Sequence, residues 1–351
     1  MPAGLHADHR RANLCINMSA KSRSVPIVGI TMGDAAGIGP EIVLKALTSG
    51  AFPKHLRCIV IGDGSVLRRM AAQLNLNISF RQFELEADIR EGDVEVFDLE
   101  NLPQQFQIGI DSALTGKSAA ENVVAAVGLW KAGELDAIAT APISKKAISM
   151  GGFEFPGHTE FLAELTDTTE FAMSFFAGKL RVVLLSTHLP LISAIKLVKS
   201  ETLVRLIEFS DRELRKLLGR SVRIAIAGLN PHASEGGMFG AEEEKEIAPA
   251  IALCRSKGIE VTGPYAPDTI FMRTHRGEFD ACIAMYHDQA TIAVKALSFG
   301  KGVNVTLGLP LVRTSVDHGT AYDIAGKGIA DGSSMREAIV LAGELAWGRD
   351  L

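Results

Sequence analysis

The sequence is poor in the residue types that mark several classes of protein. Its four cysteines lie far apart and form no Cys-x-x-Cys motif, which argues against a disulfide framework or a zinc–thiolate site and favours a reducing, cytoplasmic setting. No apolar run approaches the roughly 20 residues of a membrane-spanning helix, so no membrane partner is expected. Residues 1–24 lack the apolar segment of a secretory signal, and we expect them to form a flexible N-terminal tail.

Basic and aromatic residues are also scarce. Lysine and arginine number 36 against 41 aspartates and glutamates, a net charge of -5, which argues against a nucleic-acid partner. Aromatic residues make up 6% of the chain and hydrophobic residues 47%, so the core is expected to be aliphatic. A chain of 351 residues has room for two domains, or for one large α/β domain with two lobes.

Short apolar segments alternate with helical segments along the chain, which is typical of the α/β class. The expected strands cover residues 25–31, 58–62, 94–99, 136–140, 180–187, 223–228 and 280–285. The first strand leads into a glycine turn with Gly33, Gly37 and Gly39, and a helix is expected to begin at Pro40. Such a turn either holds an anion at the helix N-terminus or is a plain tight connection between strand and helix.

Three histidines follow the ends of three expected strands. His188, His232 and His287 each come within a few residues of a strand end, and the carboxyl ends of parallel strands share one edge of a sheet. Imidazole suits zinc or a related divalent ion, and three histidines leave coordination positions open for catalysis. The alternative is that they are separate surface or core histidines. Asp268 and Asp288 are acidic neighbours that could orient a histidine or accept a proton.

The stretch of residues 286–328 combines charged residues with many glycines. It is predicted to be a row of loops at strand ends, where binding groups are usually displayed. Lys295, Asn304 and Arg313 suit a small anion, because lysine offers a point charge and arginine a two-pronged donor. The lysine pair at residues 145–146 also follows a strand end, but such a pair is more often part of a solvated face than of an anion site.

Several motifs resemble those of a known family. The segment HGTAYDIAGKG, residues 318–328, resembles the adenosine-binding loop of the isocitrate and isopropylmalate dehydrogenase superfamily. From about residue 25 to residue 346, the chain resembles the 4-hydroxythreonine-4-phosphate dehydrogenase family. The motifs that carry this resemblance are ITMGDAAGIGPEI, TAPISK, GHTEFLA, STHLPL, GLNPHASEGG, APDT, YHDQ and GLPLVRTSVDHGTAYDIAGKG. One departure is Ser234, which stands where the family pattern has glycine.

The resemblance implies a two-lobed fold of the isocitrate/isopropylmalate dehydrogenase type, with α/β/α sandwiches and the active site in the interdomain cleft. Residues 25–150 and 300–351 would form the dinucleotide-binding lobe, and residues 151–299 the metal, substrate and dimerisation lobe. The resemblance also implies a homodimer with the site near the subunit interface, where one subunit can supply a histidine to the metal site of the other.

The resemblance further implies the ligands of particular residues. The metal, which would be zinc, magnesium, manganese or cobalt, would bind to His188, His232 and His287. The phosphorylated hydroxy acid would contact His158, Thr159, Lys295, Asn304 and Arg313. NAD or NADP would lie against Gly33, Asp34, His318, Gly319 and Asp323. The general base remains open among Asp268, Asp288, Lys295 and a metal-bound hydroxide.

The implied reaction is an oxidation followed by a decarboxylation. The secondary alcohol of 4-phosphohydroxy-L-threonine would be oxidised to the 3-oxo acid, which would lose carbon dioxide to give 3-amino-2-oxopropyl phosphate in pyridoxal phosphate biosynthesis. Dehydrogenases of D-threonate or D-erythronate 4-phosphate are an alternative. Aromatic cis-dihydrodiol dehydrogenases are disfavoured by GHTEF and by the lysine, asparagine and arginine set. A non-catalytic binding protein with the same fold is disfavoured by the three histidines.

Overall fold

The computed structural model describes residues 25–50, 52–53, 55–86, 92–155, 157–298 and 301–348. The expected tail of residues 1–24 lies outside this part of the chain. The strands are β1 (Ile27–Thr31), β2 (Arg57–Gly62), β3 (Ser79–Gln82), β4 (Asp93–Asp98), β5 (Ala137–Thr140), β6 (Ala172–Ala177), β7 (Leu180–Leu184), β8 (Ile224–Ala227), β9 (Val261–Tyr265), β10 (Ala281–Ala284), β11 (Val303–Leu307) and β12 (Val312–Ser315).

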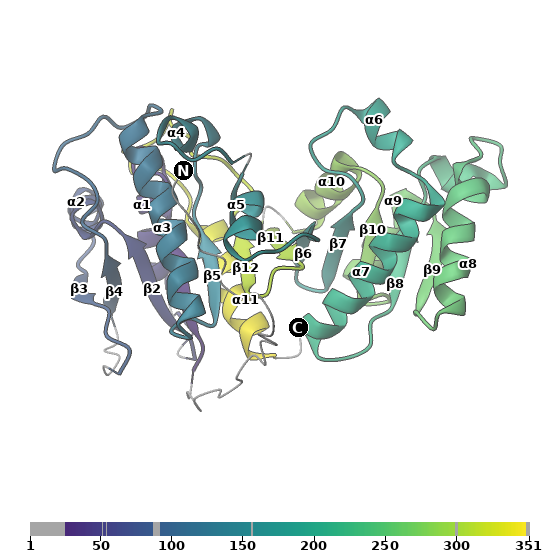
Figure 1. Ribbon diagram of the computed structural model, residues 1–351, viewed down its shortest axis with the longest axis horizontal. Coiled ribbons are helices and arrows are strands. Elements are labelled where there is room, and N and C mark those ends of the chain that lie inside the picture. Colours follow the sequence, from purple (N-terminus) through teal and green to yellow (C-terminus); the bar gives the residue numbers. More distant parts are fainter. Residues whose placement is uncertain are drawn as a thin grey trace, which may run out of the picture.

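These strands form one mixed sheet that runs through the whole molecule (Figure 1). Its order is β3-β4-β2-β1-β5-β12-β11-β6-β7-β10-β8-β9, and we call the part from β3 to β12 the first half and the rest the second half. Strands within each outer part are parallel. At the centre β11 runs antiparallel to β12 and β6, and β6 antiparallel to β7.

Helices cover both faces of this sheet (Figure 1). They are α1 (Gly39–Thr48), α2 (Gly64–Gln73), α3 (Ala113–Lys131), α4 (Lys145–Met150), α5 (His158–Leu165), α6 (Leu191–Lys196), α7 (Ser200–Leu218), a π-helical turn η2 (Glu243–Ile247), α8 (Ala248–Ser256), α9 (Pro267–His275), α10 (His287–Ser298) and α11 (Ser333–Trp347). None of the helices in the described part of the chain combines the length and the apolar character that crossing a membrane requires.

Alternate residues of single strands enter different cores. In the first half, Val28 and Ile30 of β1 pack with α1, α2 and α11, whereas Ile27 packs with α3 and α5. In the second half, Val183 of β7 packs with α7 and α8, whereas Val182 packs with α9 and α10. This alternation is expected of strands buried on both faces. The predicted α/β fold, with a sheet between two helical layers, is therefore confirmed.

The predicted row of loops over residues 286–328 is wrong in large part. The helix α10 and the strands β11 and β12 lie within it. In β11, Val303, Val305 and Leu307 alternate along the strand and are all buried, which is the period-two pattern of a strand. The polar residues between them obscured this pattern, because several belong to the candidate site. The strands β3, β6 and β9 were also not predicted.

The predicted division into two lobes at residue 150 stays a prediction. Phe161 and Leu162 of α5, which follow this boundary, are buried in the core of the first half. In Figure 1, α4 and α6 both lie at the top of the view, and they follow β5 and β7 respectively. The chain segments that follow β5 and β7 are therefore exposed on the same side of the molecule, where a site can form between the two halves.

Candidate functional site

The three predicted metal-binding histidines follow β7, β8 and β10, which are parallel neighbours in the sheet. The structure brings His188 and His287 together, with their ring centroids 5.5 Å apart. In the described part of the chain, no three histidine, cysteine, aspartate or glutamate side chains are grouped so that they could hold a metal ion. The structure therefore groups two of the three histidines, and His232 lies apart from them.

The histidine pair has the chemistry that a divalent metal needs. Burial, followed by the charges of Lys145 and His287, lowers the pKa of His188 and favours its neutral, metal-binding form. Two imidazoles that bind one tetrahedral ion at about 2.1 Å would have ring centroids about 5 Å apart. The observed separation of 5.5 Å matches this geometry. Nδ1 of His287 lies 2.7 Å from a carboxylate oxygen of Asp288, which leaves its other ring nitrogen for a ligand.

His232 lies in a loop with an unusual backbone. Four successive residues, His232 to Glu235, have φ between 47° and 63°, a left-handed conformation that is uncommon outside glycine. The conformation explains why glycine suits position 234, where this chain has a buried serine. A run of such residues persists only where surrounding structure holds it, and this often occurs at functional sites.

The π-helical turn η2 supplies the support for this loop. The buried carboxylate of Glu243 accepts hydrogen bonds from the backbone N–H groups of Leu229 and Asn230 at 2.8 and 2.7 Å. The side-chain amide of Asn230 donates to Glu243 and Glu242, each at 2.8 Å. These hydrogen bonds hold the backbone immediately before His232, whose imidazole is exposed.

Arg313 is the centre of the predicted substrate site. It is 2% exposed, and it donates to the hydroxyl oxygens of Thr140 at 2.9 Å and Thr306 at 3.0 Å, with Thr159 at 3.5 Å. Burial lowers the pKa of Arg313 to about 10, so it remains charged at neutral pH. Its hydrogen-bond acceptors are neutral hydroxyls, and none of the ion pairs in the described part of the chain involves it. The charge of Glu160 partly offsets the effect of burial on the pKa of Arg313, but no carboxylate lies within ion-pair distance of it in the described residues, which indicates an anionic ligand.

Two further predicted substrate residues carry buried polar atoms without a partner. These atoms are Nε2 of His158 and Oδ1 of Asn304, and Nε of Arg313 is a third. Burial, followed by the charge of Arg313, lowers the pKa of His158 well below its usual value, so the imidazole is neutral. Asn304 pairs with Ser315 across β11 and β12, close to Arg313 in sequence and in the sheet. Buried polar atoms are normally hydrogen-bonded, so this set is suited to a polar ligand.

Lys295 and the two candidate acids lie around α10. Nζ of Lys295 is 3.2 Å from the carboxylate of Asp317, which joins α10 to the segment after β12. Asp268 and Asp288 line a hollow of about 410 Å³ between α9 and α10, together with Tyr286 and Ile292. The structure therefore brings the two acidic candidates for proton transfer to one surface depression.

The predicted cofactor residues fall into two groups. His318, Gly319 and Asp323 are exposed in the loop after β12. Asp34 is fully buried: one carboxylate oxygen accepts from the Tyr322 hydroxyl at 2.6 Å and the other from a backbone N–H at 2.9 Å. Gly33 has a φ of 74°, and a side chain there would lie 2.5 Å from the carbonyl oxygen of Pro142. Gly33 and Asp34 thus build the turn on which the exposed loop rests.

The glycine turn is a tight structural connection. The backbone N–H groups of Asp34, Ala36, Gly37 and Ile38 all donate to acceptors within the protein. The acceptor of Ile38 is the carbonyl oxygen of Thr320 in the exposed loop, at 2.9 Å. Of the two interpretations of the turn, the structure favours the tight connection over the anion site.

Helix α1 holds the far end of the loop after β12, which contains the predicted cofactor residues His318, Gly319 and Asp323. Nζ of Lys45 donates to the carbonyl oxygens of Gly328 and Ala330 at 2.9 and 2.7 Å, and to the buried carboxylate of Glu41 at 2.8 Å. The same Glu41 oxygen accepts from the backbone N–H of Ala330 at 2.8 Å. Both ends of the loop are therefore fixed to the first helix and its preceding turn.

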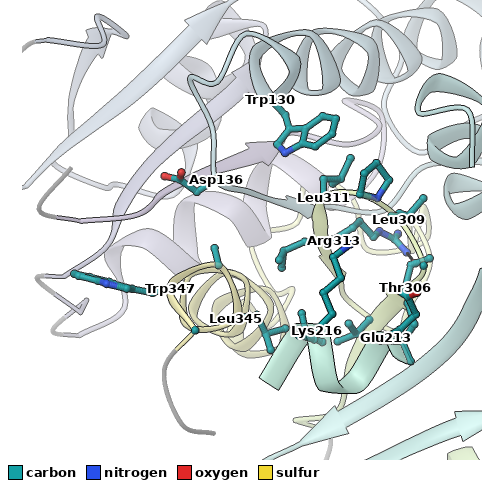
Figure 2. A pocket seen from close by; sticks show the side chains of 18 of the residues that line it. Trp130, Asp136, Glu213, Lys216, Thr306, Leu309, Leu311, Arg313, Leu345 and Trp347 are labelled. Carbon is teal, nitrogen blue, oxygen red and sulfur yellow. Dashed lines mark hydrogen bonds between the residues drawn. The ribbon is translucent and has the colours of Figure 1, made fainter. Parts of the chain in front are cut away.

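A second hollow is lined in part by Arg313 and Thr306 and otherwise by residues outside the predicted site. It measures about 390 Å³ and forms where α3, α7 and α11 end and where β5 and β12 begin (Figure 2). Figure 2 shows Trp130, Asp136, Lys216 and Trp347 among its lining residues. Ligands in parallel sheets bind at the carboxyl ends of strands, which favours the opposite edge of the sheet, where the histidines lie, over this hollow.

Several residues of the site carry no strong signal in the sequence. Thr140 and Thr306 orient Arg313, Tyr322 contacts Asp34, and Glu243 supports the histidine loop. Lys145 is close enough to affect the pKa of His188, although the sequence predicted a solvated lysine pair. The position of Lys145 directly after a strand end was the available signal.

Comparison with known proteins reveals extensive similarity. The family model described as pyridoxal phosphate biosynthetic protein PdxA matches residues 54–342. A D-threonate 4-phosphate dehydrogenase from Cupriavidus necator is 44% identical over 92% of this chain and 98% of its own. A 4-hydroxythreonine-4-phosphate dehydrogenase from Beijerinckia indica is 43% identical over 91% of this chain and 94% of its own. The crystal structure of 4-hydroxythreonine-4-phosphate dehydrogenase from Klebsiella pneumoniae has a TM-score of 0.85 at 42% identity, covering 92% of this chain and 99% of that one.

Proposed function

The chain belongs to the family of the pyridoxal phosphate biosynthetic protein PdxA and is a dehydrogenase, and we propose that it oxidises 4-phosphohydroxy-L-threonine with NAD or NADP. The secondary hydroxyl at C3 loses its proton and the carbon loses a hydride, which gives the 3-oxo acid. That acid releases its carboxylate as carbon dioxide and leaves 3-amino-2-oxopropyl phosphate.

The buried guanidinium of Arg313 is the observation that carries this proposal. It is oriented by three threonine hydroxyls and has no carboxylate partner in the described part of the chain. A phosphorylated acid supplies the missing negative charge. Nε2 of His158 and Oδ1 of Asn304 are available for further polar contacts, and Lys295 and Thr159 complete the proposed substrate contacts. A substrate held by several fixed groups reacts in one orientation.

We propose a divalent metal at His188 and His287, with His232 as the third ligand. When bound, the metal supplies positive charge that lowers the pKa of the substrate hydroxyl and stabilises negative charge on its oxygen. The carboxylate of Asp288 orients the ring of His287 from its other side. Asp268, Asp288 and Lys295 are the candidates for accepting the hydroxyl proton.

The third histidine leads to the proposal of a homodimer. Exposed apolar side chains border the histidines: Leu191 and Ile192 on α6, Met238 and Phe239 after the His232 loop, and Ile292 on α10. Each is between 45% and 73% exposed, which is costly in a monomer. A second copy related by a two-fold axis would cover this surface on both subunits and bring the His232 loop of one to the histidine pair of the other.

The nucleotide is proposed to lie against the loop that contains His318, Gly319 and Asp323. A bound NAD or NADP accepts the hydride. The protein's part is to hold the loop, and Asp34, Gly33 and the hydrogen bonds from α1 do so.

The test is the absorbance rise at 340 nm with NAD or NADP and a panel of acids, with and without a chelator. We expect turnover of 4-phosphohydroxy-L-threonine, loss of turnover in the chelator, and recovery when zinc, magnesium, manganese or cobalt is returned. D-threonate and D-erythronate 4-phosphates serve as comparison substrates, since the Cupriavidus relative is named for the first. Faster turnover of either comparison acid, or full turnover in the chelator, would contradict the proposal.

A further inference from the structure

Two adjacent lysines at the start of α4 have different surroundings. Nζ of Lys146 lies 3.4 Å from the carboxylate of Asp111, and its side chain is 76% exposed. Lys145 forms no ion pair with any carboxylate in the described part of the chain. The two neighbours therefore differ in one respect that matters for binding: Lys146 is held in an ion pair and Lys145 is not.

The side chain of Lys145 extends from the end of β5 toward the substrate residues. A Cβ built on Gly157 would lie 3.5 Å from Cε and 3.9 Å from Nζ of Lys145. Gly157 directly precedes His158, whose Nε2 is buried without a partner. The same built atom would lie 3.1 Å from a carboxylate oxygen of Glu160. The end of the lysine side chain therefore lies beside Gly157 and the first turn of α5.

Lys145 is the third cation around the proposed substrate position. Arg313 is buried and oriented by hydroxyl groups, and Lys295 is held at 3.2 Å by Asp317. Lys145 lies beside Gly157, directly before the predicted substrate residue His158, so its ammonium is available to a ligand bound there. A substrate with a phosphate and a carboxylate carries two anionic groups, and Arg313 alone cannot contact both ends of a four-carbon acid.

We propose that Lys145 binds an anionic oxygen of the substrate, from the phosphate or the carboxylate, at the end that Arg313 does not hold. This inference rests on the proposed function, since it assigns one more contact to the same site. The lysine acts as a point charge with three donors, which suits either group. Ser144 fixes the start of α4 by accepting the N–H of Ala147 at 3.2 Å, which positions the lysine stem.

The experiment compares three variants of the full-length chain: Lys145→Met, Lys145→Arg and Lys146→Met. Methionine keeps the length of the side chain and removes its charge, arginine restores the charge, and the Lys146 variant removes the neighbouring charge. We expect Lys145→Met to raise KM for the phosphorylated acid about 10- to 100-fold, the value of one charge-assisted hydrogen bond, with KM for the nucleotide unchanged. We expect Lys145→Arg to recover most of the loss and Lys146→Met to match the wild type.

Two inhibitors identify the anionic group. Inorganic phosphate and unphosphorylated D-threonate are each titrated against wild type and Lys145→Met, by competition and by calorimetry. Weaker binding of phosphate assigns the lysine to the phosphate end, and weaker binding of D-threonate assigns it to the carboxylate end. Unchanged binding of both, together with an unchanged KM, would overturn the inference. The calorimetric arm needs no turnover, so it decides the role of Lys145 even if the proposed reaction fails.

Discussion

The Tyr322 hydroxyl donates a hydrogen bond of 2.6 Å to the fully buried carboxylate of Asp34, across 288 positions of sequence. Burial raises the pKa of Asp34, and the hydrogen bonds from Tyr322 and from the backbone of Ala36 partly offset that rise. The contact joins the exposed loop after β12 to the turn after β1, the first strand of the chain. It therefore couples the proposed nucleotide site to the core of the first half.

Replacing Tyr322 by phenylalanine tests this coupling. The variant loses one hydrogen bond to a buried carboxylate, and we expect it to destabilise the protein by about 1–3 kcal/mol. We also expect NAD to bind several-fold more weakly, because the loop is held in fewer places. Thermal unfolding measures the first effect and fluorescence titration with NADH the second. Tyr265→Phe, in β9 of the second half, is the matched control; nucleotide binding unaffected by Tyr322→Phe would refute the coupling.

Replacing Arg313 by lysine tests the substrate site. Lysine keeps the charge but cannot contact Thr140 and Thr306 at the same time with a fixed fork. We expect kcat/KM for the phosphorylated acid to fall about 100-fold, as for loss of a charge-assisted bidentate contact. Arg57→Lys is the control, since Arg57 is also buried but pairs with Glu95 at 2.7 Å. We expect Arg57→Lys to lower the stability of the protein and to leave KM unchanged. If both variants changed KM equally, the role of Arg313 would be structural.

Mixing two inactive variants tests the shared metal site. His188→Ala and His232→Ala each remove one proposed ligand, and each homodimer should lose metal and activity. If His232 completes the site of the other subunit, a mixed dimer contains one intact site. After random exchange of subunits, half of the dimers are mixed, and each mixed dimer has one intact site of its two. We therefore expect about a quarter of wild-type activity to be recovered. Metal content measured after mixing should recover equally. No recovery after verified exchange would place all three ligands within one subunit.

Asp63 gives a prediction for stability against pH. It begins α2, where its carboxylate accepts from the N–H groups of Ser65 at 2.9 Å and Val66 at 3.1 Å, and from Leu102 at 3.0 Å. Burial raises the pKa of Asp63, but these hydrogen bonds outweigh it and the net pKa lies below its usual value. Its contribution is therefore present above the unfolded pKa of about 3.9 and is lost as pH falls through the lower folded value.

We expect Asp63→Asn to cost about 1 kcal/mol at neutral pH, and this cost should shrink below about pH 4 as the wild-type carboxylate is protonated. Urea unfolding of both proteins across this range measures it. Ser112→Ala is the control, because Ser112 begins α3 with a neutral hydroxyl that accepts from Thr115 at 3.1 Å. The cost of that change should not vary with pH. A pH-independent cost at Asp63 would mean that its charge contributes nothing.

The sequence predicted the elements whose signals are local. The strands β1, β2, β5, β7, β8 and β10 are short apolar runs bounded by turn residues, and each was found close to its expected position. In β11 and β12, polar residues such as Asn304 and Arg313 interrupt the apolar pattern, because they face the site. Local composition therefore indicated loops where the structure has strands.

The candidate site also combines features that the local sequence predicts with features that depend on the tertiary structure. A histidine after a strand end can be read from the sequence, and the meeting of His188 and His287 follows from the parallel pairing of β7 and β10. The distance of His232 from that pair depends on the path of its loop, which is set by left-handed backbone angles at non-glycine residues. The proximity of Lys145 to Gly157 depends on the tertiary arrangement of α4 and α5, which no spacing in the sequence reveals.

The ladder between β11 and β6 has a mechanical consequence. All five residues of β11, Val303 to Leu307, pair with β6, and β6 pairs in turn with β7. Hydrogen bonds between strands thus join the described part of the molecule without interruption from one flank to the other. We therefore expect substrate to enter and product to leave by twisting of this continuous sheet rather than by rotation of one half about a hinge.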